Sequence, residues 1–472
     1  MINAEEQIED LNLYDFHRCS KRNGEPIEIL DNKIAEYVSH SLLRMFILEG
    51  VPYIYNQGYY ERDEEGKRLK TYIKGFIFPD LITITRINRV YNLILVDFSL
   101  TKEKEEVNDY PKYWVNFKNG MYDPVMQEMH PHDPKYFAIN QIPHVYDPTA
   151  TYRGSVTEKF LTGLFPDAGD REMFLAYSGY CMTVDTSLQK FMIITGLPGT
   201  GKSTAISMLI DAVGIKNVCS ITLQDLNTRF TPTVLLGKLL NACADLPKKA
   251  LDQVDEIKKI TGEDLVKGEY KGGKTFWFKS HSKLIFSANE MPVNHDEKSD
   301  AFYRRLITIA VTQKGEKISG LKKGLQDGMP GFIHECMDAL HRMYVSGKGI
   351  DSENSKRLVH EYHRDADTVQ AFLDDRVIIK PDAKVERGSL YNLYQKYCWL
   401  NQWTPLGNKS FFANLRGKGF TDKGSSGVRY FIGLCPIDGD NALSSAFDRE
   451  GFRQTTLSEN AVFMGNNSNE SI

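Results

Sequence analysis

The sequence predicts a multidomain α/β protein with a P-loop core, an N-terminal α+β and helical domain, and a C-terminal winged helix. Three observations predict this fold class. An apolar run at 191–194 leads into a glycine-rich loop and then an apolar helical stripe, which is the order of a P-loop domain. Two later apolar runs end at the polar positions 245 and 289, as neighbouring parallel strands do. Residues 384–434 combine two helical patterns, a glycine-rich turn and a final strand.

Composition limits the class of protein. A chain of 472 residues with 41% hydrophobic content can hold several buried cores. The net charge of -4 excludes a wholly basic coat protein but not a nucleic-acid enzyme, because a few clustered lysines suffice. The seven cysteines form no C-x-x-C pair, so neither a zinc ribbon nor a disulfide framework is expected. Without an apolar run of signal or membrane-span length, we expect a soluble, intracellular protein with no membrane partner.

Changes in composition predict six parts along the chain. Within the first part, a helical stretch at 32–50 precedes alternating tyrosines at 53–73, which predicts a small α+β domain. A charged break, strands and turns, and a helical segment near 154–186 follow. The predicted parts are an N-terminal domain (1–100), a family-specific region and helical collar (101–186), the nucleotide core (187–346), a helical linker (347–383), a winged helix (384–435) and a disordered polar tail (436–472).

The glycine-rich loop predicts a nucleotide site. The spacing from Gly196 to Ser203 fits G-x-x-x-x-G-K-[ST], whose backbone N–H groups surround phosphates. In such a loop Lys202 contacts the terminal phosphates and Ser203 holds Mg²⁺. We therefore expect ATP and Mg²⁺ as ligands. The predicted nucleotide-binding residues are Gly196, Pro198, Gly199, Thr200, Gly201, Lys202, Ser203 and Thr204.

Two polar residues at predicted strand ends are candidates for catalysis. Asp245 follows the apolar run 239–244, and a carboxylate there can hold Mg²⁺ beside Ser203 and position water. Asn289 follows the apolar run 284–286 and can sense the γ-phosphate. The structural alternatives are a capping aspartate and an ordinary turn asparagine.

Two adjacent arginines stand directly before another apolar strand. Arg304 and Arg305 are candidates for an arginine finger, which stabilises the charge of a transferring phosphoryl group. Arg305 is favoured because it adjoins the strand, although both are retained. Such a finger often comes from a neighbouring subunit, so this function requires an oligomer. The alternative is a pair that is solvated or bound to a carboxylate.

A predicted hairpin at 266–279 carries lysines beside aromatic residues. Gly272 and Gly273 supply the tight turn. Lysines that bind phosphates and an aromatic ring that stacks on bases suit single-stranded DNA. A merely solvated hairpin is the alternative. The predicted DNA contacts here are Lys267, Lys271, Lys274 and Trp277.

The predicted winged helix is basic in an otherwise acidic chain. Residues 384–434 hold five lysines and three arginines against Glu386 and Asp422. Such asymmetry favours a surface for duplex DNA. Lys409 and Arg416 are expected on the recognition helix and Arg429, with Lys423, in the wing. The alternative is a winged helix that docks protein.

Taken together, these motifs are similar to those of superfamily 3 helicases, most closely the phage and plasmid primase/helicase family that includes the poxvirus primase-helicase. The resemblance covers roughly 110–434 and rests on GLPGTGKS, the strand ending in Asp245, the lysine hairpin, and FSANEMP followed by the arginine pair. It implies an AAA+-type P-loop ATPase core in a homo-hexameric ring that moves along single-stranded DNA. Its catalytic residues are then Lys202, Asp245, Asn289, Arg304 and Arg305.

Two departures from the family qualify this expectation. Many members have two adjacent acids at the strand end, whereas Ala244 precedes Asp245 here, so Asp245 has to serve both metal and water or another acid activates the water. A primase site needs clustered carboxylates, whereas the strand-like segment 92–100 has only Asp97. We therefore expect no primase activity in this chain and a separate primase or replisome protein as partner.

The expected function is ATP-dependent DNA unwinding in the replication of a phage, plasmid or other mobile element, in the cytoplasm of a bacterial host. If the winged helix binds origin duplex, the same chain is also the replication initiator. An ATP-regulated winged-helix transcription factor and, less favoured, a P-loop kinase are the alternatives. A strand-displacement assay separates the helicase from the regulator.

Overall fold

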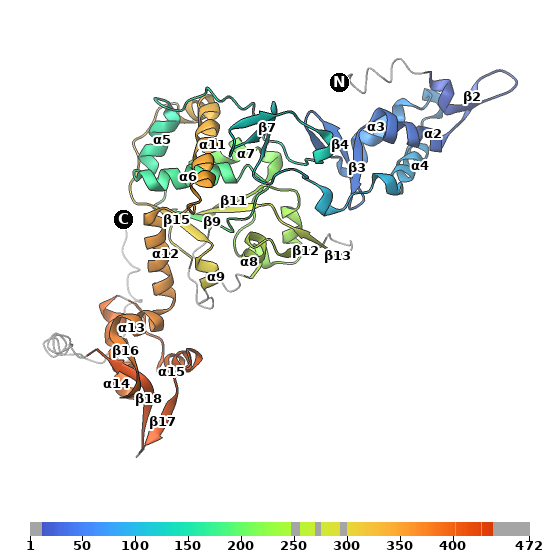
Figure 1. The fold of residues 1–472 in the computed structure, drawn as a ribbon. Coiled ribbons are helices and arrows are strands. Elements are labelled where there is room, and N and C mark those ends of the chain that lie inside the picture. Colours follow the sequence, from blue (N-terminus) through green and yellow to red (C-terminus); the bar gives the residue numbers. More distant parts are fainter. Residues whose placement is uncertain are drawn as a thin grey trace, which may run out of the picture. The chain divides into compact units, whose positions relative to one another are not determined.

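The computed structural model describes residues 12–246, 255–269, 275–292, 300–401, 403–425 and 427–437. Two compact units divide the chain at residues 366 and 367, and each is considered by itself (Figure 1). The α/β class is confirmed: the larger unit contains a parallel sheet between helices, and the chain has several separate cores. Most of the predicted tail lies outside the described residues. In the described ranges, no helix combines the length and the apolar character that crossing a membrane requires.

The N-terminal part of the larger unit is an α+β lobe. A three-stranded antiparallel sheet, in the order β3-β4-β5, packs with the helices around Ile34, Leu69, Ile73 and Val90. The lobe contains β1 (His17–Cys19), β2 (Pro26–Ile29), α2 (Asp31–Glu36), a π-helical turn (Tyr37–Leu42), β3 (Met45–Leu48), β4 (Val51–Asn56), β5 (Tyr59–Arg62), α3 (Lys67–Gly75) and α4 (Ile84–Leu95).

Two secondary-structure predictions for this lobe are wrong. The helix expected over 32–50 stops at Leu42, and β3 follows because its four residues are all buried while paired with β4. Pairing with β4 thus outweighs local helix propensity. The strand expected at 92–100 is instead the end of α4, whose Val90 and Ile94 are buried at a helical spacing, followed by a 3-10 turn at Phe98–Leu100. Asp97 accepts hydrogen bonds from the Ser99 backbone N–H (2.9 Å) and shares one with His40 (2.8 Å).

A connecting region joins the lobe to the parallel sheet. Its Asn-rich turns are ordered by side-chain hydrogen bonds: Asn116 Nδ2 donates to the carbonyls of Gly58 (3.0 Å) and Asn140 (2.9 Å), and Asn140 Nδ2 donates to Asn217 Oδ1 (3.0 Å). These bonds attach the β4–β5 turn to the core. The region contains β6 (Val115–Phe117), β7 (Gly120–Asp123), β8 (Glu128–His130), α5 (Val156–Leu164) and α6 (Ala168–Tyr180).

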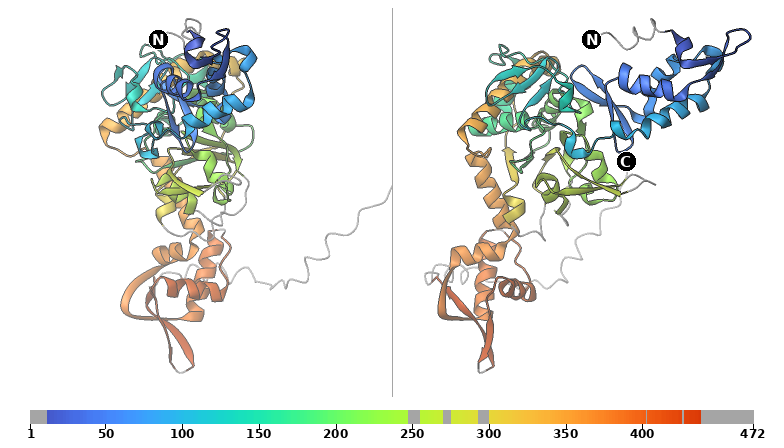
Figure 2. Two further views of the ribbon diagram at one scale, coloured as in Figure 1. Left: turned by 90° about the vertical axis from the view of Figure 1, so that its right-hand side faces the viewer. Right: turned by 45° about the vertical axis from the view of Figure 1, so that its right-hand side comes forward.

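The core is a five-stranded parallel sheet in the order β10-β11-β14-β9-β15. Strands β9 and β14 inside the sheet and β15 at its edge are almost wholly buried, as a sheet covered on both faces requires. Helices lie on both sides of the sheet (Figure 2). The strands of this sheet are β9 (Phe191–Gly196), β10 (Val218–Cys219), β11 (Leu240–Leu246), β14 (Lys283–Ala288) and β15 (Leu306–Val311). The helices of the core are α7 (Lys202–Val213), α8 (Asp255–Thr261), α9 (Asp300–Tyr303), α10 (Leu321–Asp327), α11 (Met329–Ser346) and α12 (Glu353–Ala366). A separate hairpin consists of β12 (Leu265–Glu269) and β13 (Thr275–Lys279).

The second unit packs three helices against a three-stranded antiparallel sheet in the order β16-β18-β17. Its separate core includes Phe372, Tyr394, Phe411 and Phe431. The elements are α13 (Thr368–Arg376), β16 (Val377–Glu386), α14 (Arg387–Leu400), α15 (Asn408–Gly417), β17 (Asp422–Ser425) and β18 (Val428–Pro436). Thus α13 and most of β16, which the sequence assigned to a linker, are part of this unit. The bounds of the six predicted parts otherwise stay predictions.

Candidate functional site

Three predicted site segments lie together at the carboxyl ends of the parallel strands. Strands β11, β14 and β9 are adjacent and parallel, with Leu284 opposite Phe191 and Ala288 opposite Thr195. Their carboxyl ends therefore lie together, which is where open α/β sheets bind ligands. The glycine loop follows β9, Asn289 follows β14, and Asp245 lies near the end of β11.

The end of β11 differs from the expected pattern. The strand continues through position 245 to Leu246, and its register with β14 gains one residue between Cys243 and Leu246. A bulge of this kind bends a strand and redirects its side chains. The Asp245 side chain is outside the described residues, so its role stays a prediction. Asn289 is exposed, one residue beyond the end of the adjacent strand β14.

The glycine loop has a backbone that side chains would not allow. Gly196 has a φ of +143°, and a Cβ atom there would lie 2.1 Å from the Val311 carbonyl oxygen. Gly201 has a φ of +109° and directly precedes α7. Glycine is required at both places because L side chains rarely adopt such angles. The loop thus passes tightly over β15 and turns at once into a helix N-terminus.

Lys202 points back into this loop. Its ammonium donates to the carbonyls of Gly196 (2.6 Å) and Leu197 (2.9 Å), and the residue is only 7% exposed. Thr200 Oγ1 donates to the same Leu197 carbonyl (2.9 Å). Ser203, one residue into the helix, is exposed. A helix N-terminus with a lysine at its centre is suited to an anionic ligand.

The arrangement fits a metal ion only in part. Ser203 presents an exposed hydroxyl group, whereas the expected second ligand, Asp245, lies beyond the described side chains. Among the side chains that the structure describes, no three His, Cys, Asp or Glu residues gather as a metal site. A Mg²⁺ ion that is held largely by substrate phosphates needs only one or two protein ligands. Mg²⁺ therefore stays a prediction.

The arginine pair lies at the opposite end of the parallel strands, where the strands begin. Strand β15 runs parallel to β9 with Leu306 opposite Phe191, so Arg304 and Arg305 precede the strand where β9 begins. Strand β9 has six residues, each of which advances the chain by about 3.3 Å. The amino-terminal end of β9, where the arginines lie, is therefore about 20 Å from the glycine loop at its carboxyl end. Within one chain, the arginines and the loop are not brought together.

The two arginines also differ from each other. Arg304 is exposed, whereas Arg305 is 7% exposed and its Nη1 donates to the Ala301 carbonyl (2.7 Å). Burial, and then the charge of Arg304, lower the pKa of Arg305. Arg305 is therefore engaged inside its own chain, and Arg304 is the arginine that faces solvent.

Sequence reasoning missed a lysine that anchors Arg304. Lys190, directly before β9, donates to the Arg304 carbonyl (2.8 Å) and to Asp351 Oδ1 (2.8 Å). It thereby ties the start of β9 to the arginine segment and to the chain just before α12. No motif contains Lys190, so no local signal could have found it.

The hairpin β12–β13 has one buried and one exposed face. Val266 and Phe278 are opposite each other and buried, whereas Lys267 and Trp277 are opposite each other and exposed, Trp277 at 54%. The predicted cation and aromatic ring therefore share the solvent face. Lys271 and Lys274 lie outside the described residues.

In the second unit, one carboxylate gathers three arginines. Asp422 accepts from Arg387 (3.3 Å), Arg416 (2.9 Å) and Arg429 (3.2 Å) while its own side chain is 7% exposed. The hydrogen bond from Arg416 and the neighbouring positive charges lower the pKa of Asp422. Arg416 and Arg429 are thus held close together with a net excess of positive charge. Lys409 is exposed on α15.

Two family models match parts of the chain. Residues 58–166 match the family described as D5 N terminal like, and residues 194–305 match a family of unknown function (DUF5906). The first match begins at the β4–β5 turn and covers the rest of the lobe and the connecting region as far as α5. The second begins within β9, includes the glycine loop, Asp245 and Asn289, and ends at Arg305. Each covers less than half of the chain.

The chain is also similar to known proteins. It is 24% identical over 381 residues to "Putative helicase L207/L206" of Acanthamoeba polyphaga mimivirus. That alignment covers 72% of this chain and 38% of the relative, so the chain spans well under half the length of this curated relative. Solved structures of the NrS-1 C-terminal region match 83% to 85% of the chain and 96% to 100% of their own, at 12% to 13% identity and TM-scores of 0.48 to 0.49.

Proposed function

We propose that this protein is an ATP-dependent DNA helicase of a replicating virus, phage or mobile element, of the superfamily 3 type. The observation that carries the proposal is that the glycine loop lies with the ends of β11 and β14 at the carboxyl ends of the parallel strands. The exposed Arg304 lies at the opposite, amino-terminal ends. The similarity to a D5-like domain and to a mimivirus protein named as a helicase supports it. A strand-displacement assay with forked DNA and ATP is the direct test, and absence of unwinding refutes the proposal.

In this proposal the chain's own groups hold the triphosphate. Lys202 exchanges its two loop carbonyls for the terminal phosphates, and the backbone N–H groups of the loop bind the remaining phosphate oxygens. Ser203 and Asp245 hold Mg²⁺, which supplies neutralisation of the phosphate charge. Asn289, exposed at the end of the adjacent strand, orients the attacking water.

The distant arginine requires a second subunit. An arginine about 20 Å from its own loop cannot reach its own nucleotide, because an extended side chain covers far less. We therefore propose that Arg304 acts on the nucleotide of a neighbouring copy in a homo-hexameric ring with an AAA+-type core. Arg305, favoured by the sequence, holds the Ala301 carbonyl instead. A heterologous interface repeated around a ring provides this geometry.

The hairpin is the proposed grip on single-stranded DNA. We expect Trp277→Ala to leave basal ATP hydrolysis within about twofold and to reduce DNA-stimulated hydrolysis about tenfold, since stacking on one base contributes 1–3 kcal/mol. The measurement is hydrolysis with and without a single-stranded oligonucleotide. Trp403 is not a suitable control position because it packs in a core. Tyr14→Ala is the control, because Tyr14 is an exposed aromatic residue that is distant from Trp277 in the sequence. Equal stimulation in the two variants contradicts the assignment.

The second unit is the proposed duplex-binding winged helix. Helices α14 and α15 are followed by the hairpin β17–β18, and its arginines surround Asp422. We expect Lys409→Ala to lower the slope of log affinity against log salt for duplex DNA by about 0.9, one phosphate contact. Lys348→Ala, an exposed lysine of the larger unit, is the control. An unchanged slope removes Lys409 from the interface.

Origin recognition is the finer version of this second role. Footprinting of the full chain on origin-containing DNA tests it, and protection without sequence preference leaves the protein a helicase that is loaded by others. The ATP-regulated transcription factor is the second candidate, favoured by the same arginine cluster. It predicts duplex binding without strand displacement.

A further inference from the structure

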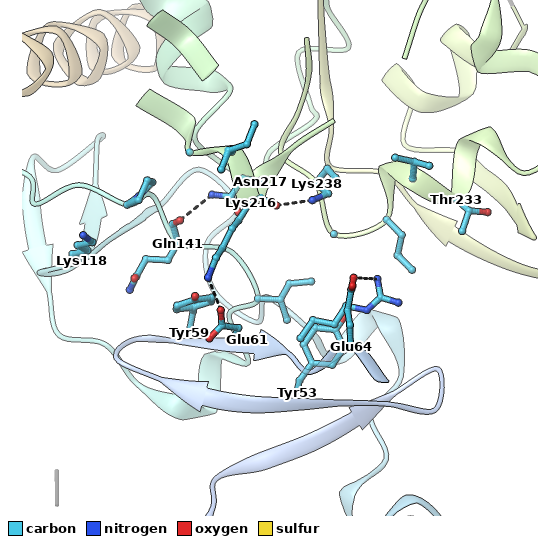
Figure 3. Close-up of a pocket in the computed structure, with 18 of the residues that line it drawn as sticks. Tyr53, Tyr59, Glu61, Glu64, Lys118, Gln141, Lys216, Asn217, Thr233 and Lys238 are labelled. Atoms are coloured by element: carbon cyan, nitrogen blue, oxygen red, sulfur yellow. Dashed lines mark hydrogen bonds and ion pairs between the residues drawn. The ribbon is translucent and has the colours of Figure 1, made fainter. Parts of the chain in front are cut away.

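A cavity of about 1060 Å³ lies between the N-terminal lobe and the sheet-bearing core of the larger unit. Figure 3 shows Tyr53, Tyr59 and Glu61 on the β4–β5 side of the cavity and Lys216 reaching toward Glu61 from the core, with Lys238 bonded to the Lys216 backbone. Lys216 Nζ donates to Glu61 Oε1 (2.5 Å) across it. The core segments that line the cavity include those directly before β10 and β11. The cavity therefore lies at the amino-terminal ends of the parallel strands, whereas the glycine loop lies at their carboxyl ends.

The cavity carries an excess of positive charge. Its carboxylates already have cationic partners: Glu61 binds Lys216 and Arg68, and Glu269 binds Arg229. Glu64 is 3.9 Å from Arg62. In contrast, no carboxylate of the described residues pairs with Lys118 or Lys238; Lys238 Nζ donates only to the Lys216 carbonyl (2.6 Å). These two ammonium groups are available to an anionic ligand.

Flat apolar groups line the same space. Tyr59 is half-buried on β5, and Phe230 is 38% exposed on the core side. Phe230 has a φ of +72°, which is a genuine outlier for a bulky side chain. Such strain persists only where the surroundings enforce it, and it is concentrated at functional sites. The backbone therefore holds an aromatic ring at the cavity at a cost in stability.

The cavity borders the proposed DNA hairpin at the end of β12. Glu269, the last residue of β12, lines it, and its backbone N–H donates to Thr233 Oγ1 (2.8 Å), another lining residue. Arg229 binds Glu269 through two hydrogen bonds (2.6 and 3.0 Å) and lies 4.8 Å from the centre of the Phe230 ring. Single-stranded DNA that is bound by the hairpin therefore lies next to the cavity.

We propose that this cavity is a second binding site for single-stranded DNA, which takes up nucleotides that leave or approach the hairpin. A base lies against Tyr59 or Phe230, and the flanking phosphates bind Lys118 and Lys238. Aromatic rings beside positively charged side chains are the features by which proteins bind single strands without sequence preference. The proposal rests on the DNA-binding role of the hairpin and adds a site that involves the N-terminal lobe.

The affinity test uses the full-length protein and a fluorescent thirty-nucleotide oligo(dT). We expect Lys118→Met combined with Lys238→Met to lower the slope of log affinity against log salt by about 1.4, two contacts with a single strand. Phe230→Gly removes the ring while glycine tolerates the positive φ, and it is expected to lower the affinity about tenfold. An unchanged melting temperature shows that this loss does not come from unfolding. Tyr59→Ala weakens binding and Tyr59→Phe restores it. Lys323→Met, an exposed lysine on α10, is the matched control.

The position of the strand is tested by photo-crosslinking. An oligonucleotide with 5-iododeoxyuridine is expected to crosslink to the peptides that contain Tyr59 and Phe230. Crosslinks confined to the hairpin, with unchanged salt slopes, overturn the cavity proposal while the helicase proposal stands. If Trp277→Ala also leaves DNA binding unchanged, the hairpin assignment fails instead. Competition by free dTTP at equal affinity for the cavity shows a mononucleotide site and likewise overturns the proposal.

Discussion

Lys202→Ala is expected to abolish ATP hydrolysis and DNA unwinding, with a loss of at least about 10²-fold in hydrolysis rate. The lysine ammonium is the cationic side chain that the structure places inside the glycine loop, 2.6 Å and 2.9 Å from two loop carbonyls. Alanine removes this charge from the developing negative charge of the phosphates. The measurement is phosphate release at saturating ATP and Mg²⁺, together with displacement of a labelled strand.

The control for this variant separates folding from chemistry. Lys202 is nearly buried, so its removal also releases two carbonyls, and the melting temperature of the variant has to be measured. Ser203→Ala is the companion change, because the Ser203 side chain is exposed and makes no hydrogen bond with the described residues. It is expected to raise the Mg²⁺ concentration needed for activity without lowering the melting temperature. Hydrolysis by Lys202→Ala within about twofold of the wild-type rate would exclude the glycine loop as the nucleotide site.

The sequence predicts features that depend on local chemistry. The glycine loop is recognisable because Gly196 and Gly201 need backbone angles that few other residues adopt, and the helix predicted after the loop is present and starts at Lys202. The hairpin faces follow from the alternation around Trp277. These features depend on a few adjacent residues, so a single sequence suffices to find them.

Features that depend on tertiary pairing could not be predicted. Residues 45–48 form a strand because β4 pairs with them, and the hydrogen bond from Arg305 to the Ala301 carbonyl is not visible in the sequence. Lys190 and Phe230 gain their interest only from partners that are distant in the sequence or from backbone strain. Such partners are set by the order of strands in the sheet, which no local pattern encodes.

The order of strands leads to the second large effect. Arg304→Ala is expected to reduce hydrolysis by about 10³-fold or more while nucleotide affinity stays within about threefold, since an arginine finger stabilises charge that develops in the transition state. Arg304 is exposed and about 20 Å from its own loop, so its loss should not disturb nucleotide binding by the same chain. Hydrolysis rates and binding of a fluorescent ATP analogue give the two readouts.

Arg305→Ala is the matched comparison. Arg305 is buried and donates to the Ala301 carbonyl, so this change is expected to lower the melting temperature and to affect hydrolysis only through that instability. If Arg305→Ala instead shows a folded protein that binds nucleotide and does not hydrolyse it, while Arg304→Ala is active, the assignment of the finger is reversed.

Mixing the two inactive variants decides whether the finger acts between copies. Arg304→Ala subunits keep an intact loop, and Lys202→Ala subunits keep an intact finger. In a ring of equal proportions, about a quarter of the interfaces join a good loop to a good finger, so the mixture should recover about a quarter of the wild-type hydrolysis. A finger that acted on its own chain would give no recovery, because each subunit would lack one of its two essential groups.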